Sequence, residues 1–205
     1  MNGENHLKIG LVTGATYCLA TGQAKMLPLA LPVAGVAALL VDIDSKKSKA
    51  NKLLKIVAPV SALIAGAAYT MNNEILNTVR TSLEHPTTSV MGFILFLITL
   101  AIGKMSDHRK FTHRFYGTAM FIASAYMMSP MIFMPFALGY MSHIIADSMT
   151  TAKVEFFAPF FPVKLGISIA TTETKQNIVT NTYMIFCAIF VFSQLMDLGR
   201  LIAFK

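Results

Sequence analysis

Six long stretches of this 205-residue chain lack Asp, Glu, Lys and Arg, and they constrain the fold more than any other feature. An apolar run of roughly 20 residues is long enough to cross the hydrocarbon core of a bilayer as a helix. Only 13% of the residues are charged, whereas a soluble domain has roughly 25%. The uncharged runs are Ile9–Ala24, Met26–Val41, Ile56–Asn73, His85–Gly103, Phe115–Thr151 and Gln176–Leu195. The chain is therefore predicted to be an all-α, polytopic membrane helix bundle that forms one domain, residues 1–205.

The fifth run is too long for a single crossing. Pro130 and Pro135 are predicted to break it into a tight hairpin, because proline removes a helical donor and clashes with the preceding turn. The first two runs are short and contain several glycines and prolines, so they are compatible with tilted or re-entrant helices. The prediction is therefore about five to seven transmembrane or half-membrane helices, the last of them over residues 176–196.

The polar clusters of the chain fall at alternate ends of these runs. Because successive helices cross in opposite directions, His6, Asp42/Asp44, His108/His113 and His143/Asp147 all reach one side of the bilayer. Thirteen of the 17 Lys and Arg residues fall on the same side. The positive-inside rule then places the N-terminus and these clusters at the cytoplasmic face.

His143 and Asp147 stand four residues apart in an otherwise apolar run, which puts both side chains on one helix face. Ionisable groups at membrane depth are costly and mark functional sites. Imidazole and carboxylate suit a divalent metal ion, zinc first and manganese or magnesium behind it. The pair is equally compatible with hydrogen bonding between helices.

Two further clusters have a functional and a structural interpretation each. His108 and His113 lie in SDHRKFTH, at the start of a predicted helix, where they are metal ligands or part of a polar loop. Asp42 and Asp44 are two residues apart and cannot share a helix face, so the chain is predicted to have left the helix there. They are candidate metal ligands or a general base, or they simply end the helix, although acids at a helix C-terminus are unfavourable.

Single residues and surface segments complete the analysis. His6 gains weight only from its side of the membrane, and Arg109 either orients a phosphate or is an ordinary cytoplasmic basic residue. The run Lys46–Lys55 is predicted to contact anionic lipid head groups, and no nucleic-acid partner is expected. Ala152–Lys175 is predicted to lie on the membrane as a lid or interfacial segment.

Taken in order, His6, DID (Asp42–Asp44), HRKFTH (His108–His113) and GYMSHIIAD (Gly139–Asp147) resemble the membrane-bound metal-dependent hydrolase family. That family includes the LexA-regulated inner-membrane hydrolases of bacteria. Its pattern is an early histidine, Leu-Pro-Asp-x-Asp-His, His-Arg-Gly-x-Thr-His, and Gly-x-x-x-His-x-x-x-Asp followed by threonine. The match defines a metal-site core over residues 6–162.

The resemblance implies a location in the bacterial inner membrane and a role for each matching residue. The implied metal ligands are His6, Asp44, His108, His113, His143 and Asp147, and the implied catalytic residues are Asp42, Asp44 and Arg109. Thr112 and Thr150 match as supporting polar positions. Val41, Ser45 and Lys110 depart from the family's proline, histidine and glycine. The histidine missing at Ser45 is a candidate ligand of a second metal or a group that supports one.

The predicted function is hydrolysis, assisted by a divalent metal, of a phosphoester or lipid-like substrate at the cytoplasmic membrane surface. A bound ion lowers the pKa of its water toward about 7. Two other functions use the same residues. One is a metal or proton transporter with His and Asp as a relay, and the other is a degenerate protein that keeps the cluster only for structure.

Overall fold

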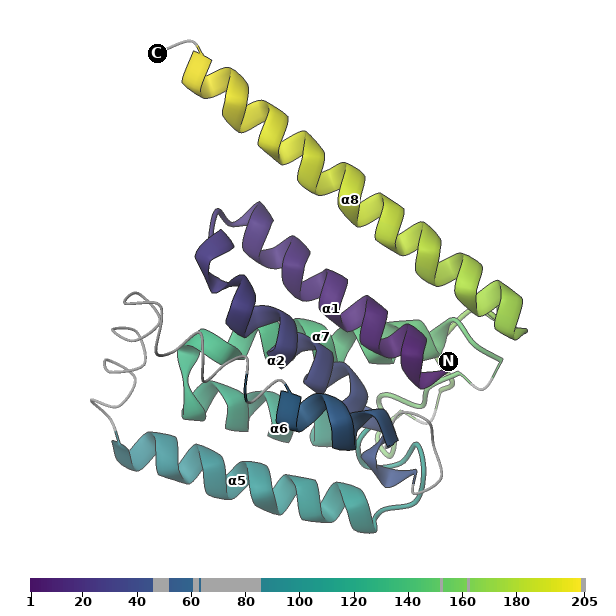
Figure 1. The fold of residues 1–205 in the computed structure, drawn as a ribbon. Helices are drawn as coiled ribbons and strands as arrows, with labels where there is room; N and C mark the ends of the chain where they lie inside the picture. Colours follow the sequence, from purple (N-terminus) through teal and green to yellow (C-terminus); the bar gives the residue numbers. More distant parts are fainter. Residues whose placement is uncertain (46–51, 61–62, 64–85, 152, 162, 204–205) are drawn as a thin grey trace.

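The computed structural model describes residues 1–45, 52–60, 63, 86–151, 153–161 and 163–203, and these are predominantly helical (Figure 1). The elements are α1 (Gly3–Ala20), η1 (Ala24–Met26), α2 (Leu27–Leu40), η2 (Val41–Asp44), α5 (Pro86–Met105), α6 (Phe115–Met128), α7 (Pro130–Ser148) and α8 (Glu173–Ala203). Residues 52–60 are also helical. The predicted class, a helical membrane bundle, is confirmed.

Three helical stretches of the described residues are long and apolar enough to cross a membrane: Ala24–Asp44, Thr87–Met105 and Glu173–Gln194. The first is largely buried inside the bundle, whereas the other two expose most of their apolar side chains. Helix α6 has 14 residues, about 21 Å of helix, which is shorter than a hydrocarbon core of roughly 30 Å. The bundle therefore combines two apolar stretches of spanning length at its surface with one inside it, and it also contains the shorter helix α6.

The long fifth run is divided at Ser129, as the prolines predicted. Ser129 has an extended backbone, its hydroxyl accepts a hydrogen bond from the N–H of Met131, and Pro130 is the first residue of α7. Pro135 does not break the chain, contrary to the expectation, but lies inside α7. Because proline has no N–H, Pro135 leaves the second turn of α7 without one backbone hydrogen bond. The burial of Phe136 and Tyr140 on the following turns outweighs that loss.

Helices α1, α2 and α7 pack along a seam of small residues. A Cβ atom added to Gly10 would lie 2.6 Å from Cβ of Ala38, and one added to Gly139 would lie 2.3 Å from the carbonyl oxygen of Ala34. Such spacings leave no room for a side chain. Close backbone approach through small residues is the usual way in which helices associate in lipid. The seam brings the end of α2 within reach of both α1 and α7.

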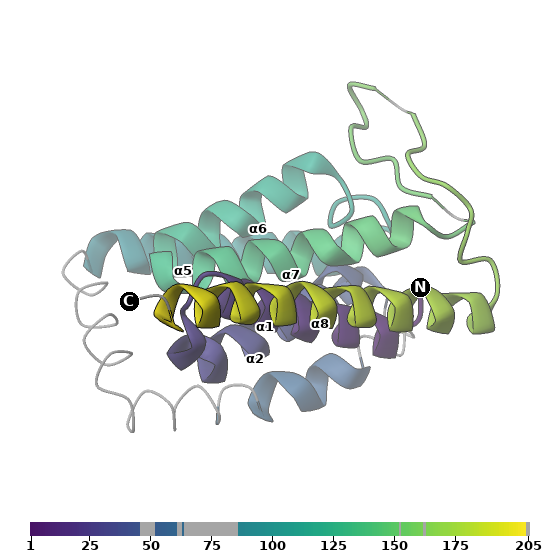
Figure 2. The same ribbon diagram turned by 90° about the horizontal axis from the view of Figure 1, so that it is seen from above.

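The ends of the bundle differ in character. Figures 1 and 2 show the connection into α8 at the same end as the N-terminus, and the C-terminus at the far end of α8. Helix α8 packs on α1, where the side chains of Asn5 and Asn177 and those of Thr13 and Tyr183 are hydrogen-bonded. The polar clusters also meet at the N-terminal end, as the alternation of helices predicted.

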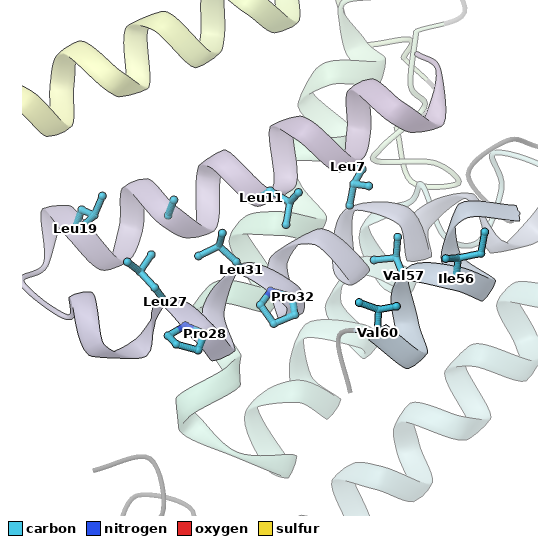
Figure 3. Close-up of a pocket in the computed structure, with 11 residues that line it drawn as sticks. Leu7, Leu11, Leu19, Leu27, Pro28, Leu31, Pro32, Ile56, Val57 and Val60 are labelled. Atoms are coloured by element: carbon cyan, nitrogen blue, oxygen red, sulfur yellow. The ribbon is translucent and has the colours of Figure 1, made fainter. Parts of the chain in front are cut away.

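An apolar groove of about 710 Å³ runs along α1, α2 and residues 52–60 (Figure 3). Leu7 lines it at one end and Leu19 at the other. Lys52 and Lys55 are exposed near its third wall, while the remaining lysines of the predicted head-group contact, in residues 46–51, lie outside the described residues. Cys18 and Cys187 are buried free thiols.

Candidate metal centre

Four segments bring all the predicted ligands to one place. His6 comes from α1, Asp42 and Asp44 from η2, His108 and His113 from the loop before α6, and His143 and Asp147 from α7. All of these side chains are buried except that of His108, which is half-exposed. The cluster therefore gathers residues that are up to 141 positions apart in the sequence, between His6 and Asp147.

The centre of the cluster is formed by Asp42, His113, His143 and Asp147, whose ligand atoms all lie within 4.8 Å of one another. Nε2 of His113 is 3.6 Å from Oδ1 of Asp42 and 3.5 Å from Oδ2 of Asp147. Nε2 of His143 is 3.6 Å and 3.8 Å from the same two atoms. These separations are too long for hydrogen bonds. They fit ligands of a shared ion, because two atoms about 2.1 Å from a tetrahedral zinc lie about 3.4 Å apart.

The hydrogen bond of His143 supports the same interpretation. Its Nδ1 is 2.6 Å from the carbonyl oxygen of Ala38, which can only accept, so Nδ1 carries the proton. In a neutral imidazole, Nε2 then presents a lone pair to the carboxylates of Asp42 and Asp147. Among the residues that the structure describes, neither Nε2 of His143 nor Nε2 of His113 has a hydrogen-bond partner, and both atoms are buried. A cation between these atoms would remove the repulsion between the nitrogen lone pairs and the carboxylate oxygens. A metal-binding histidine commonly donates its other ring N–H to a backbone carbonyl, as Nδ1 of His143 does to Ala38.

His6 stands against this centre rather than in solvent. Its ring is stacked on that of His143, with centroids 3.6 Å apart, and its Nε2 is 3.1 Å from Oδ1 of Asp147. Neither ring nitrogen makes a hydrogen bond to any residue that the structure describes. The amino group of Met1 also contacts Oδ1 of Asp147. His6, which the sequence alone supported least as a metal ligand, is thus fully buried beside the other predicted ligands.

Asp44 holds the loop that carries the other histidines. It accepts hydrogen bonds from Nδ1 of His108 at 2.9 Å, from the backbone N–H of Arg109 at 2.8 Å and from the hydroxyl of Thr112 at 3.1 Å. The bond to Asp44 raises the pKa of His108, against the opposing effect of burial. Asp42, Asp44 and His108 also form a second group with ligand atoms within 4.8 Å, which is where a second ion would lie.

Arg109 reaches into the centre from the edge. Its backbone adopts a left-handed conformation, φ 62°, and its Nη2 donates to Oδ2 of Asp147 at 2.9 Å. The neighbouring Lys110 departs from the family's glycine without entering the centre, since it pairs with the exposed Asp107 at 2.6 Å. Val41, the second departure, is fully buried in the apolar core.

Sequence reasoning missed Tyr140. Its hydroxyl donates to the carbonyl oxygen of Thr112 at 2.6 Å and so fixes the residue before His113. The signal was available, because Tyr140, His143 and Asp147 follow the i, i+3, i+7 spacing of one helix face. Thr150 matches a supporting position, and its hydroxyl donates to the backbone carbonyl of Asp147 at the end of α7.

These features define a helical membrane protein whose buried histidines and carboxylates gather at one end of the bundle. The profile of the YdjM inner membrane protein family matches residues 1–201, and the chain belongs to this family. The proteins named inner membrane protein YdjM from Escherichia coli (strain K12) and from Shigella flexneri are each 34% identical to it over 92 residues. That alignment covers 42% of this chain and 46% of each relative, so the chain spans about half the length of the curated relatives it matches. No solved structure is detectably similar. Membership confirms the predicted inner membrane location.

Proposed function

We propose that the chain is a membrane-bound metal-dependent hydrolase. The observation that carries the proposal is the pair of buried, unpartnered Nε2 atoms of His113 and His143, which face the carboxylates of Asp42 and Asp147 at 3.5 to 3.8 Å. Two imidazoles with two carboxylates suit zinc, with manganese or magnesium as other candidates. A second ion would be held by Asp42, Asp44 and His108.

Each of the other residues has a separate task in this proposal. When bound, the ion supplies an activated water and polarises the bond to be cleaved. Asp42, whose carboxylate faces the imidazoles of His113 and His143, would be placed to accept the proton of that water as a general base. Arg109 is placed to stabilise negative charge on a phosphoryl or acyl oxygen. Asp44 positions the loop of residues 108–113 through its three hydrogen bonds.

The surroundings support a phosphoester or lipid-like substrate. The apolar groove of Figure 3 begins at Leu7, which directly follows His6 in α1. A polar pocket of about 420 Å³ lies on another side, lined by Arg109, Thr150 and Gln176 among others. An apolar groove and a polar pocket beside one metal centre suit a ligand that has an apolar part and a polar part. The excess of Lys and Arg on this side supports a cytoplasmic orientation of the centre.

The transporter alternative receives less support. Within the described residues, every buried histidine and every buried carboxylate belongs to this one cluster. The hydroxyl groups of Thr99, Ser124 and Thr180, buried elsewhere, bond to carbonyls of their own helices. A relay across the bilayer would need ionisable groups along a path. The arrangement at one end of the bundle therefore favours chemistry over transport.

Metal content and activity together test the proposal. We expect one or two ions per chain by mass spectrometry of the detergent-purified protein, and their loss in the double variant His143→Ala/Asp147→Ala. Asp107→Asn, which removes an exposed carboxylate in the adjacent loop, is the control and should keep the metal. Hydrolysis of phosphoester and lipid substrates should disappear after chelation and return with zinc. Full activity in a metal-free preparation would refute the hydrolase.

A further inference from the structure

A second, strongly basic pocket lies beside the candidate metal centre. Its volume is about 230 Å³, smaller than a typical ligand cavity of roughly 300 Å³ or more and suited to a compact polar group. Its lining residues are His108, Arg109, Lys110, Arg114, Lys153, Val154, Glu155 and Lys164. Of these, His108 and Arg109 have a role in the proposed chemistry, and the other lining residues have none.

The charges of this pocket are not balanced. Five of the lining residues are Lys or Arg, and Glu155 is the one carboxylate among them. Glu155 is 3.6 Å from Nη2 of Arg114 and 4.0 Å from Nζ of Lys164, both longer than a good charged hydrogen bond. Two of the five cations have carboxylate partners outside the lining, Lys110 with Asp107 at 2.6 Å and Arg109 with Asp147 at 2.9 Å. The pocket thus keeps an excess of two positive charges in a small volume, and an anion would relieve their mutual repulsion.

The backbone of this pocket is strained at two positions. Among the described residues, Arg109 with φ 62° and Lys153 with φ 48° are the non-glycine residues with positive φ, and both line this pocket. Such conformations are energetically unfavourable for residues with a side chain and persist where the surroundings hold them, often at ligand sites. The Nε atoms of Arg109 and Arg114 are moreover buried and have no hydrogen-bond partner in the described part of the chain. Unpartnered guanidinium donors are suited to phosphate oxygens.

The connection to α8 carries exposed aromatic side chains next to the lysines of this pocket. An antiparallel bridge between Val154 and Leu165 brings Lys153 and Lys164 to the base of this segment. The residues between them include Phe160 and Phe161, which are 76% and 68% exposed. Figure 2 shows the segment projecting beyond the helices at the end that holds the N-terminus. Exposed aromatic rings next to lysines are typical of a surface that meets lipid head groups.

We propose that this basic pocket binds a phosphate group of the substrate. Arg109 connects the two sites, because its side chain lines this pocket and donates to Asp147 of the metal centre. A phosphate held there by Lys153, Lys164 and Arg114 would place the neighbouring ester bond at the metal centre. This assignment of the substrate class rests on the proposed hydrolase function, whereas the binding of phosphate does not. The phosphate belongs either to a lipid head group or to a soluble compound.

Binding measurements on the purified protein in a maltoside detergent test the proposal. The probes are dioctanoyl phosphatidic acid, dioctanoylglycerol as its phosphate-free counterpart, and inorganic phosphate. We expect the phosphatidic acid to bind, the glycerol compound not to bind, and the double variant Lys153→Ala/Lys164→Ala to weaken binding at least tenfold. Lys8→Ala/Lys175→Ala removes two exposed lysines outside this pocket and should bind as the wild type does.

The arms of the experiment separate the possible outcomes. Binding of phosphatidic acid alone assigns a lipid head group, and binding of inorganic phosphate as well assigns the bare phosphate group. Lys153→Gly removes the charge while relieving the positive φ, so it should also lose affinity in a folded protein. Equal affinities in wild type and pocket variants, or equal binding of dioctanoylglycerol, would overturn the proposal. Metal content is measured in parallel, and phosphate binding by a protein without metal or hydrolysis would refute only the hydrolase.

Discussion

The substitution Gly139→Ala tests whether the small-residue seam positions the metal centre. The added Cβ would lie 2.3 Å from the carbonyl oxygen of Ala34, whereas ordinary contact begins at 3.4 Å, so α7 and α2 must part by about 1 Å. Overpacking of this kind costs about 1 to 3 kcal/mol. One turn along both helices, His143 donates to the carbonyl of Ala38 at 2.6 Å. The same displacement would lengthen this bond to about 3.6 Å, where it is no longer a hydrogen bond.

Two measurements follow from this displacement. We expect a fall in Tm of about 4 to 8 °C for a loss of about 2 kcal/mol, at roughly 2 to 4 °C per kcal/mol for a chain of this size. Losing the support of a metal-binding histidine typically weakens metal affinity by about 10- to 100-fold, which a competition titration with a chelating dye would measure. Gly35→Ala is the control, because its Cβ meets only the ends of the Leu7 and Leu11 side chains, which can move. Equal Tm and equal metal affinity in the two variants would refute the reasoning.

Two smaller changes test the loop and the connection to α8. Tyr140→Phe leaves the buried carbonyl of Thr112 without its donor, so the free energy of unfolding should fall by about 1 to 3 kcal/mol, measured by denaturation in detergent, and an unchanged stability would contradict this role. Phe160→Trp introduces a single tryptophan into a chain that has none, and in bilayers its emission should be blue-shifted and quenched by brominated lipids. Quenching by aqueous acrylamide as strong as that of free tryptophan would place Phe160 in water.

The placement of the polar clusters was predictable because it depends on local signals. The uncharged runs indicate which segments are helical, although α1 begins at Gly3 and α8 ends at Ala203, outside the runs. The alternation of the helix directions then brings Asp42, His113 and Asp147 to one end. The spacing of His143 and Asp147 likewise gives a shared helix face from sequence alone. The two carboxylates at positions i and i+2, Asp42 and Asp44, predicted that the chain leaves the α-helix at this point. The structure has a 3₁₀ turn there, Val41–Asp44.

Contacts between helices were not predictable in the same way. The burial of His6 depends on how closely α1 approaches α7, which the spacing of residues within α1 does not determine. The predicted break at Pro135 was wrong, since the residue lies inside α7. Proline costs the helix one hydrogen bond, but whether the helix continues also depends on how the same turn packs against its neighbours. The sequence does contain a signal for the small-residue seam, because Ala30, Ala34 and Ala38 recur every four residues on one face of α2. It does not indicate which helix packs on that face, since any helix with small residues would fit.

The 3₁₀ turn after α2 explains how two neighbouring carboxylates take different tasks. Asp42 has φ −87° and ψ 17°, outside the helical region, so the backbone turns between Asp42 and Asp44. Asp42 faces the imidazoles of His113 and His143, while Asp44 accepts three hydrogen bonds from residues 108–112. In a continued α-helix, side chains two positions apart would point to opposite faces, and one of them would leave the cluster. The end of α2 thus supplies both a candidate ligand and the anchor of the loop that delivers another.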